Sequence, residues 1–284
     1  IKVAINSVLS QSYDNWELII IDNFSNDGTE EEVSKINDNR IKFYKIRNDG
    51  IIAKSRNLGI KNSKGEIISF LDSDDWWKDN KLETAVNYIN KGYDFTFHRL
   101  IKVNPKRKYF FHKKTYSYNL TSPVFESLIS GGSCIPNSSV TLTRGLVTSL
   151  GEFDESKELV GAEDFDGWLK ISKHSNKFIQ IPKTLGYCLI GSNNFSSDEN
   201  LLRNLEAIEK SHLTCSATKS IAASFDYTRA RIYQRKKFYR KAIKFYMVTL
   251  RKKPNRQILL KSIFALFILR VCLIITYKDK ISWR

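Results

Sequence analysis

Three aspartates stand within four residues, directly after an apolar run. The run Ile67 to Leu71 has the pattern of a buried strand and leads into Asp72-Ser73-Asp74-Asp75. Carboxylates this close repel one another, and a bound cation relieves the repulsion. Carboxylate oxygens suit hard cations such as Mg²⁺ or Mn²⁺, which in turn hold diphosphates. The segment therefore indicates a site for a divalent cation and a phosphorylated ligand.

Other interpretations of this segment have to be weighed. Asp and Ser also form turns and cap helices, and a helix is expected over residues 80–91. A calcium-binding EF-hand loop would need Gly at its sixth position, where this chain has Trp76 and Trp77. A phosphohydrolase of the haloacid dehalogenase type would need Thr or Val in place of Trp76. Helix capping is thus the main alternative to a metal site.

The charge of the chain is unevenly distributed. The formal net charge is +16, yet residues 1–202 hold 26 Lys and Arg against 26 Asp and Glu, whereas residues 203–284 hold 20 against 4. This asymmetry favours a neutral body that does the chemistry and a basic tail that meets an anionic partner. The four cysteines include no Cys-x-x-Cys pair, so neither a zinc site nor a disulfide framework is indicated, and a reduced, cytoplasmic setting fits.

The body alternates helical and strand-like segments, which is typical of an α/β domain with a largely parallel sheet. A first strand normally precedes the first helix in such a domain, so a strand ahead of Ile1 is expected to be missing. A basic, aromatic-rich excursion covers residues 102–114. Helices are expected over residues 1–9, 28–36, 52–61 and 80–91, and strands over 17–21, 41–46, 67–71, 93–103, 138–142, 179–181 and 187–190.

Strand signals disappear after Leu201, which divides the chain into a body of residues 1–200 and a basic helical region of residues 201–284. Residues 230–254 carry the spacing of one tetratricopeptide-like helical hairpin, interpreted as a helical cap. The apolar segment Ile258 to Tyr277 contains Lys261 and Arg270. An Arg in mid-membrane costs about 2.5–3.5 kcal/mol on insertion scales, so we expect this segment to lie on or partly in a bilayer.

Another aspartate, Asp22, follows the strand of residues 17–21 much as Asp72 follows the strand of residues 67–71. The carboxyl ends of parallel strands meet at the edge of the sheet where α/β proteins bind ligands. One carboxylate can then accept hydrogen bonds from a base or ribose while the other holds metal and phosphate. The alternative for Asp22 is an Asx turn into the segment that follows it.

The order of these motifs resembles the family 2 glycosyltransferases, which are inverting enzymes with the GT-A fold. The resemblance covers about residues 1–190. It implies a GT-A fold, in which a Rossmann-like central mixed sheet is flanked by helices, here followed by the C-terminal helical region. The segments that carry it are Ser7 to Tyr13, Trp16 to Asp22, Ser25 to Thr29, Ala53 to Gly59 and Asp72 to Asp75.

The resemblance implies roles for residues of the donor site. Asp22 matches the aspartate that contacts the nucleoside of the sugar donor, although Asn23 stands where a second aspartate is common. Arg56 and Asn57 match a segment near the nucleotide, and their alternative is ordinary polar helix residues. Asp72 and Asp74 match the Asp-x-Asp motif: Asp74 ligates Mg²⁺ or Mn²⁺ that bridges the donor diphosphate, and Asp72 contributes to donor and metal binding.

Glu163-Asp164 resembles the family's Glu-Asp motif at the start of a helix near the acceptor. An acceptor hydroxyl must lose a proton as it attacks the anomeric carbon, so the chemistry requires a base there. We assign that role to Asp164, with Glu163 in support; without the resemblance, acidic residues that open a helix mostly complement its dipole. Trp76, Trp77 and Trp168 are candidates either for stacking on sugars or for the core.

The leading hypothesis is thus a metal-dependent inverting glycosyltransferase that acts in bacterial cell-surface polysaccharide synthesis. Its partners would be a nucleotide-sugar donor, a glycan or lipid-linked acceptor and, through the basic C-terminal region, an anionic membrane at the inner face of the plasma membrane. The alternatives are a nucleotide-sugar-binding protein without turnover, a soluble helical bundle in place of the membrane-binding region, and a basic nucleic-acid-binding protein. The last is disfavoured by the neutral body, so no nucleic-acid partner is expected.

Overall fold

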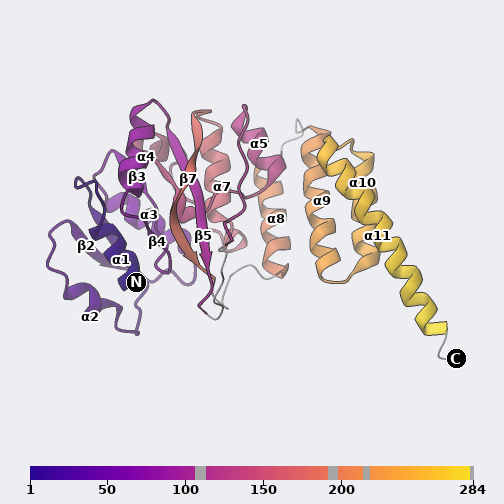
Figure 1. The fold of residues 1–284 in the computed structure, drawn as a ribbon, viewed down its shortest axis with the longest axis horizontal. Coiled ribbons are helices and arrows are strands. Elements are labelled where there is room, and N and C mark those ends of the chain that lie inside the picture. Colours follow the sequence, from indigo (N-terminus) through magenta and orange to yellow (C-terminus); the bar gives the residue numbers. More distant parts are fainter. Residues whose placement is uncertain (106–112, 191–197, 214–217, 282–284) are drawn as a thin grey trace. The chain divides into compact units, whose positions relative to one another are not determined.

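The computed structural model describes residues 1–105, 113–190, 198–213 and 218–281 (Figure 1). Two compact units are present and are described separately. Unit 1 comprises residues 1–128 and 132–195, and unit 2 comprises residues 129–131 and 196–284. Part of the predicted basic excursion, residues 106–112, lies outside the described residues.

Residues 1–190 fold into seven strands and seven α-helices among the described positions, so the predicted mixed α/β architecture is confirmed. The strands are β1 Leu18–Asp22, β2 Ile41–Lys45, β3 Ile67–Ser69, β4 Trp76–Trp77, β5 Phe95–Val103, β6 Thr141–Thr143 and β7 Phe178–Leu189. The helices are α1 Lys2–Leu9, α2 Thr29–Ser34, α3 Ile52–Asn62, α4 Lys81–Asn90, α5 Val124–Gly131, α6 Arg144–Leu150 and α7 Glu163–Ser172, with 3₁₀ turns at Asn137–Ser139 and Lys157–Leu159.

The strands form two sheets. β1 and β2 pair in parallel, with Asp22 opposite Lys45 at the end of the ladder. The other sheet has the order β3-β6-β5-β7-β4, and within it only β5 and β7 are parallel neighbours. The expectation of a largely parallel sheet is therefore wrong for this sheet. The alternation of helices and strands on which it rested is interrupted where β4 follows β3 directly, and β6 runs antiparallel between β3 and β5.

Some predicted strand boundaries also change. The strands expected at residues 179–181 and 187–190 are one continuous strand, β7, because its register shifts against β5 accommodate Pro182 and Gly186 within the strand. The strand expected at residues 138–142 begins as the 3₁₀ turn Asn137–Ser139 and becomes extended only in β6. The strand that leads to the aspartate cluster ends at Ser69.

Aromatic side chains fill the centre of unit 1. Phe95 stacks on Phe178 with ring centroids 4.3 Å apart, and Trp168 packs edge-on against Phe95 at 5.0 Å and against Phe153 at 5.7 Å. Trp168 and Trp77 are both buried, so both belong to the core. This aromatic packing joins α7, which begins at Glu163, to the strands of the five-stranded sheet.

A buried lysine, Lys81, follows the aspartate cluster in the sequence and also lies in the core of unit 1. The Lys81 ammonium group lies 3.8 Å from the centroid of the Trp77 ring and donates a hydrogen bond of 2.7 Å to the Thr141 hydroxyl. Burial lowers the pKa of Lys81 well below its usual range. The indole N–H of Trp77 donates to the carbonyl of Ser138 at 2.7 Å. These contacts fix β4 and the start of α4 against β6 and the turn before it.

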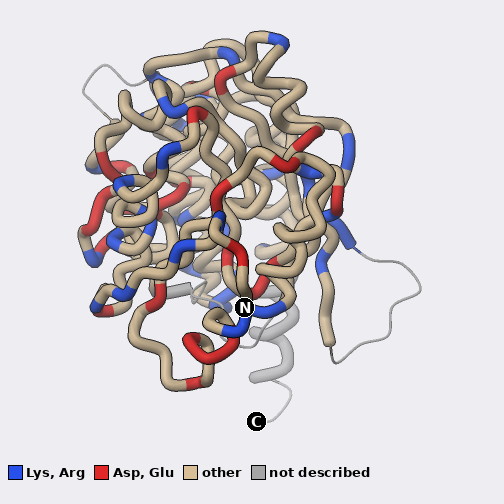
Figure 2. The backbone as a smooth tube through the Cα atoms, turned by 90° about the vertical axis from the view of Figure 1, so that its left-hand side faces the viewer, with Lys and Arg blue, Asp and Glu red and all other residues tan. Residues whose placement is uncertain are grey.

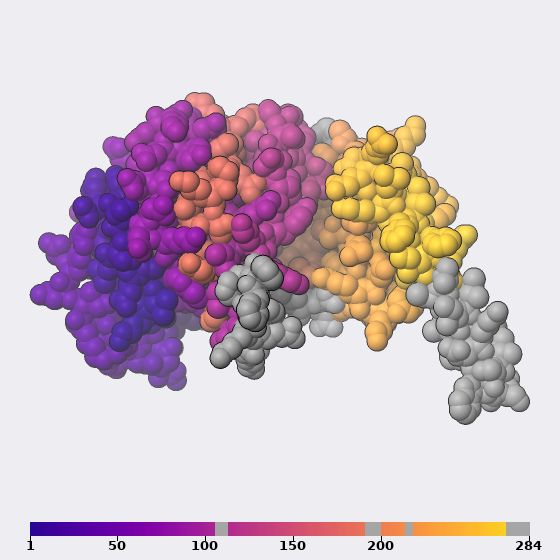
Figure 3. All heavy atoms as spheres, viewed as in Figure 1, coloured from indigo at the N-terminus to yellow at the C-terminus, as the bar shows by residue number. Residues whose placement is uncertain are grey.

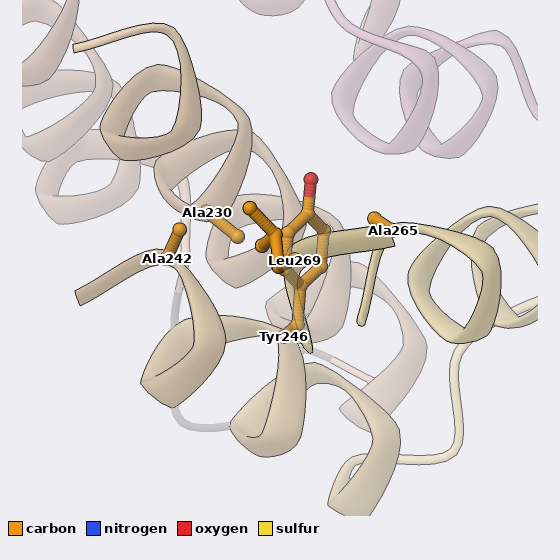
Figure 4. Close-up of a cluster of buried hydrophobic side chains, with 5 residues drawn as sticks. All are labelled: Ala230, Ala242, Tyr246, Ala265 and Leu269. Carbon is orange, nitrogen blue, oxygen red and sulfur yellow. The ribbon is translucent and has the colours of Figure 1, made fainter. Parts of the chain in front are cut away.

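Unit 2 is helical, as predicted for the region after Leu201. Its helices are α8 Asp198–His212, α9 Lys219–Arg235, α10 Tyr239–Arg251 and α11 Arg256–Ile281. Small side chains let α9, α10 and α11 approach closely, and the Tyr246 ring fills the space between them (Figure 4). The Tyr246 hydroxyl donates to Gln234 at 2.7 Å. Among the helices of the described residues, none has both the length and the apolar character needed to cross a membrane.

Gly167 offers a test of the packing between α7 and the loop that holds Phe153. A Cβ at this position would lie 2.5 Å from Cε1 of Phe153, whose ring is held edge-on by Phe70 and Trp168 and cannot retreat. We expect Gly167→Ala to lower the free energy of unfolding by about 1–3 kcal/mol, because the overlap outweighs the helix propensity of Ala. Urea denaturation measures this difference.

Gly145 in α6 is the matched control, because a Cβ there meets no atom within 4 Å. Gly145→Ala should leave stability unchanged or raise it by up to about 1 kcal/mol through helix propensity. Equal stability changes for the two variants would contradict the packing argument.

Candidate functional site

The loop between β3 and β4 presents the three aspartates on a fixed scaffold. The Asp72 N–H donates to the Ser138 hydroxyl at 3.0 Å, and the Asn137 side-chain amide donates to Asp72 Oδ1 at 2.8 Å. The Asp75 N–H closes a turn on the Asp72 carbonyl at 3.0 Å. Asp72 is therefore oriented by the turn that precedes β6, while Asp74 is exposed to solvent.

Asp75 faces the protein interior. Its side chain is buried, and its Oδ1 accepts the Leu189 N–H from β7 at 3.2 Å. Burial raises the pKa of Asp75 to about 7; repulsion by Asp72 and Asp74 adds to the shift, and a hydrogen bond from Ser138 opposes it. The residue before α4 is Asn80, so Asp75 does not cap that helix but ties the loop to β7.

The carboxylates of this loop fit a hard divalent cation. Asp72 is partly exposed and Asp74 fully accessible, so both can present oxygen ligands outward. Among the described residues, no three His, Cys, Asp or Glu side chains converge on one point. Two carboxylates match the donor set by which Mg²⁺ is held together with substrate phosphates, rather than a cage built from protein alone. The chemistry of these donors is thus compatible with the expected Mg²⁺ or Mn²⁺.

Arg56 of α3 lies between the aspartate loop and α7. Its Nη1 binds Glu163 Oε1 at 2.6 Å, and its Nη2 lies 3.7 Å from Asp72 Oδ1. Burial by itself would lower the pKa of Arg56, but the carboxylates of Asp72, Glu163 and Asp164 outweigh burial and raise it. The guanidinium group is therefore a permanent positive charge that brings together residues far apart in the sequence.

Glu163 and Asp164 open α7, where acidic side chains also complement the helix dipole. Glu163 is buried, and its second oxygen accepts the Gly161 N–H at 2.7 Å. Asp164 keeps some solvent exposure, yet protein atoms surround its carboxyl group closely enough that lost solvation raises its pKa to about 6. Arg56 opposes this shift and Glu163 adds to it. Asp164 is thus ionised at neutral pH while remaining a usable proton acceptor.

The side chains of Asn57 and Asp22 contact other parts of unit 1, and the sequence did not predict these contacts. The Asn57 amide binds both the carbonyl and the N–H of Phe153, each at 2.9 Å, and also Glu155. Asp22, which is buried, accepts the N–H of Ser25 at 3.1 Å, one residue further along than in the Asx turn considered above. The neighbouring Asn23 accepts the Asn48 N–H at 2.9 Å and so ties β1 to the loop before α3.

The structure thus brings Arg56, Asp72, Glu163 and Asp164 together, whereas the side chains of Asn57 and Asp22 contact the Phe153 loop and the Ser25 turn. Asn137 and Ser138, which orient Asp72, were not predicted as site residues. The side-chain Oδ1 of Asn137 is buried and has no hydrogen-bond partner among the described residues. One sequence signal for this pair is the polar Asn-Ser-Ser run next to Ile135 and Val140. Acidic and basic residues are intermixed along the unit 1 backbone (Figure 2).

Comparisons with known sequences identify relatives of this chain. Residues 1–139 match the family described as glycosyl transferase family 2. The Escherichia coli protein named UDP-Glc:alpha-D-GlcNAc-diphosphoundecaprenol beta-1,3-glucosyltransferase WfgD is 32% identical over 206 residues, which are 69% of this chain and 76% of that protein. An uncharacterized glycosyltransferase of Rickettsia typhi is 34% identical over 190 residues, which are 62% of this chain. The chain spans 56% of that relative and 21% of one from Rickettsia conorii.

A comparison with solved structures supports the fold. The crystal structure of residues 1–349 of Staphylococcus aureus TarS in complex with UDP superposes with a TM-score of 0.63 at 19% sequence identity. The match covers 99% of this chain and 88% of that one. At this identity the likeness concerns the fold alone, and it supports the GT-A fold expected for this chain.

The buried Asp75 predicts a pH dependence of stability. Its folded pKa of about 7 exceeds its ordinary value of 3.8, so the folded protein retains a proton that the unfolded chain releases, and stability falls as pH rises through this window. In Asp75→Asn this fall should shrink by on the order of 2 kcal/mol between pH 5 and pH 8. Urea denaturation at both pH values, with a chelator present, measures it.

Asp74→Asn is the control: it removes only the repulsion by Asp74 and leaves Asp75 buried, so it should reduce this pH dependence much less than Asp75→Asn does. An undiminished pH dependence in Asp75→Asn would mean that the Asp75 carboxyl is ionised in the folded protein.

Proposed function

The chain belongs to glycosyl transferase family 2, and from this premise we propose that it transfers a sugar with inversion from a nucleotide-diphosphate sugar to a lipid-linked or growing surface glycan. One observation carries the proposal. The Arg56 guanidinium contacts Glu163 at 2.6 Å and lies 3.7 Å from Asp72. Arg56 therefore connects a carboxylate assigned to the acceptor side with one assigned to the donor side. A sugar held between them would have a base on one face and its leaving group on the other.

The donor side rests on the aspartate loop. When bound, a divalent cation would neutralise the charge on the donor diphosphate and stabilise it as a leaving group. Asp74 and Asp72 would hold this cation, and Asp72 is already oriented by Asn137 and Ser138. Arg56 would add a second positive charge near the diphosphate. Asp22 would contact the nucleoside from the end of β1, with Asn57 supporting the donor site through the Phe153 loop.

The acceptor side rests on Asp164. Its pKa of about 6 leaves it ionised at neutral pH, so that it can remove the proton of an acceptor hydroxyl. The hydroxyl oxygen then forms a bond to the anomeric carbon, and the bond from that carbon to the diphosphate breaks. The electron pair leaves with the nucleoside diphosphate, and the proton ends on Asp164. Glu163 would support Asp164 by holding Arg56 in place.

Relatives suggest the substrates to be tried. WfgD is named for a UDP-glucose donor and a diphosphoundecaprenol-linked acceptor, and the TarS structure contains UDP. A protein of Bacillus subtilis, the putative teichuronic acid biosynthesis glycosyltransferase TuaG, is 38% identical over 92 residues, 31% of this chain and 36% of that protein. We therefore propose UDP-sugars as donors and a polyprenyl-diphosphate-linked sugar as acceptor in bacterial surface polysaccharide synthesis.

Two substitutions separate the donor and acceptor roles. A panel of UDP-sugars is first screened for Mg²⁺- or Mn²⁺-dependent thermal stabilisation, and turnover is then followed with the donor that binds. Asp74→Ala should weaken metal-dependent donor binding about tenfold or more, because a cation ligand is lost. Asp164→Asn should retain donor binding and lose transfer by about 10²–10⁴-fold, because the base is gone.

Each variant is the control of the other. Unchanged metal-dependent donor affinity in Asp74→Ala would contradict the role of Asp74 as a metal ligand. Unchanged transfer in Asp164→Asn would contradict the role of Asp164 as the base. Donor binding without turnover in the unsubstituted protein, across the whole panel of acceptors, would favour a nucleotide-sugar-binding protein over an enzyme.

We also propose that the basic C-terminal region attracts the chain to an anionic membrane at the cytoplasmic face. Lys and Arg close to an anionic leaflet contribute about 1 kcal/mol each, and this attraction is screened by salt. At low salt the protein should float with vesicles that contain phosphatidylglycerol far more than with neutral vesicles, and raising the salt should release most of it. Equal recovery with both vesicle types would rule out electrostatic attraction.

A further inference from the structure

The helix α11 has an apolar face that packs inside unit 2. Ile258, Ser262, Ala265 and Leu269 recur at intervals of three or four residues and are all buried. Ala265 and Leu269 pack with Ala230, Ala242 and Tyr246 in the cluster of Figure 4. This face is the one expected of a helix that covers a small helical core.

A second apolar face of α11 points away from that core. Its residues are large apolar side chains that are exposed to solvent. The exposed fraction is 65% for Phe264 and 67% for Phe267, and it lies between 38% and 58% for Leu260, Ile263 and Ile268. At 3.6 residues per turn these five side chains occupy roughly 140° of the helix circumference. We call them the outer stripe; they lie in the part of the chain drawn yellow in Figure 3. A helix that is apolar on both sides is normally covered on both.

Positive charges border the outer stripe. Lys261 and Arg270 are exposed, and their positions on the helical circumference fall at the two edges of the stripe. Residues 227–278 contain 15 Lys and Arg and no Asp or Glu. Apolar side chains flanked by Lys and Arg are the pattern of a helix that lies in the plane of a membrane interface, where the long basic side chains reach the headgroups.

We propose that the outer stripe of α11 is the element that inserts into an anionic bilayer, with α11 parallel to the membrane surface. This inference rests on the membrane attraction proposed above and deepens it: charge brings unit 2 to the leaflet, and the outer stripe anchors it there. A second copy of the chain is a poorer occupant. Two stripes in contact would bring the positive charges of Lys261 and Arg270 from both copies close together.

Insertion predicts a component of binding that resists salt. In Phe264→Ser with Phe267→Ser, both side chains are exposed, so the fold should persist; circular dichroism and donor binding check this. We expect the partition coefficient on phosphatidylglycerol vesicles at high salt to fall about tenfold or more, because two phenyl groups no longer leave water. The matched control is Tyr116→Ser, which removes an equally exposed aromatic side chain from unit 1 and should not change binding.

A second measurement adds a probe instead of removing contacts. In Phe264→Trp, vesicles with brominated acyl chains should quench the added fluorescence, whereas the same vesicles should not quench the fluorescence added by Tyr116→Trp. Absence of quenching at Trp-substituted Phe264, or unchanged salt-resistant binding of the double variant, would overturn the insertion of the outer stripe.

The outcomes separate this inference from the proposed function. If the parent protein binds at low salt but has no salt-resistant component, the electrostatic attraction stands and the insertion is wrong. If the stripe variant instead dissociates a dimer of the parent in solution and leaves vesicle binding intact, the stripe is an interface between copies and the inference is overturned. The donor and acceptor assignments are tested without vesicles and are unaffected by either result.

Discussion

The arrangement of the site depends on the position of one buried positive charge. Arg56 is held by a short ion pair to Glu163 and stands close to Asp72 and Asp164, which would otherwise repel each other across the site. A buried ion pair seldom adds much stability, because desolvation offsets the attraction, but removal of one partner leaves an uncompensated charge and is costly. The contribution of Arg56 is therefore geometric: it allows three acidic groups from two distant segments to occupy a common region.

The aspartates of the candidate site acquire different properties because their surroundings differ. Asp74 is exposed and suited to a cation; Asp75 is buried against β7 and retains its proton to near neutral pH; Asp164 lies between these limits. These differences arise from solvation and hydrogen bonding, since the side chains are chemically identical. In the proposed function, a single residue type thus serves metal binding, loop attachment and proton acceptance within one unit.

Local patterns predicted much of this arrangement. The apolar run before Asp72 and the neutral body followed by a basic helical region could be read from neighbouring residues, and the helix that Glu163 opens was implied by the family resemblance. Contacts between distant residues could not, because no local pattern encodes them: the Arg56 pair with Glu163, the Asn137 amide on Asp72 and the antiparallel return of β6 depend on the assembled fold. Two short strands were expected where β7 is one continuous strand, because register shifts against β5 accommodate Pro182 and Gly186.

The pairing of β4 with β7 also determines when the aspartate loop can form. Trp76 and Trp77 follow the loop directly, but their partners, Tyr187 and Gly186, are in the last strand of unit 1. Contacts between residues so distant in sequence are late and slow steps in folding. During synthesis the loop therefore lacks the pairing of β4 with β7 until nearly the whole unit has left the ribosome. A nascent chain cannot complete its donor site early, so ligand binding would report that the entire unit has folded.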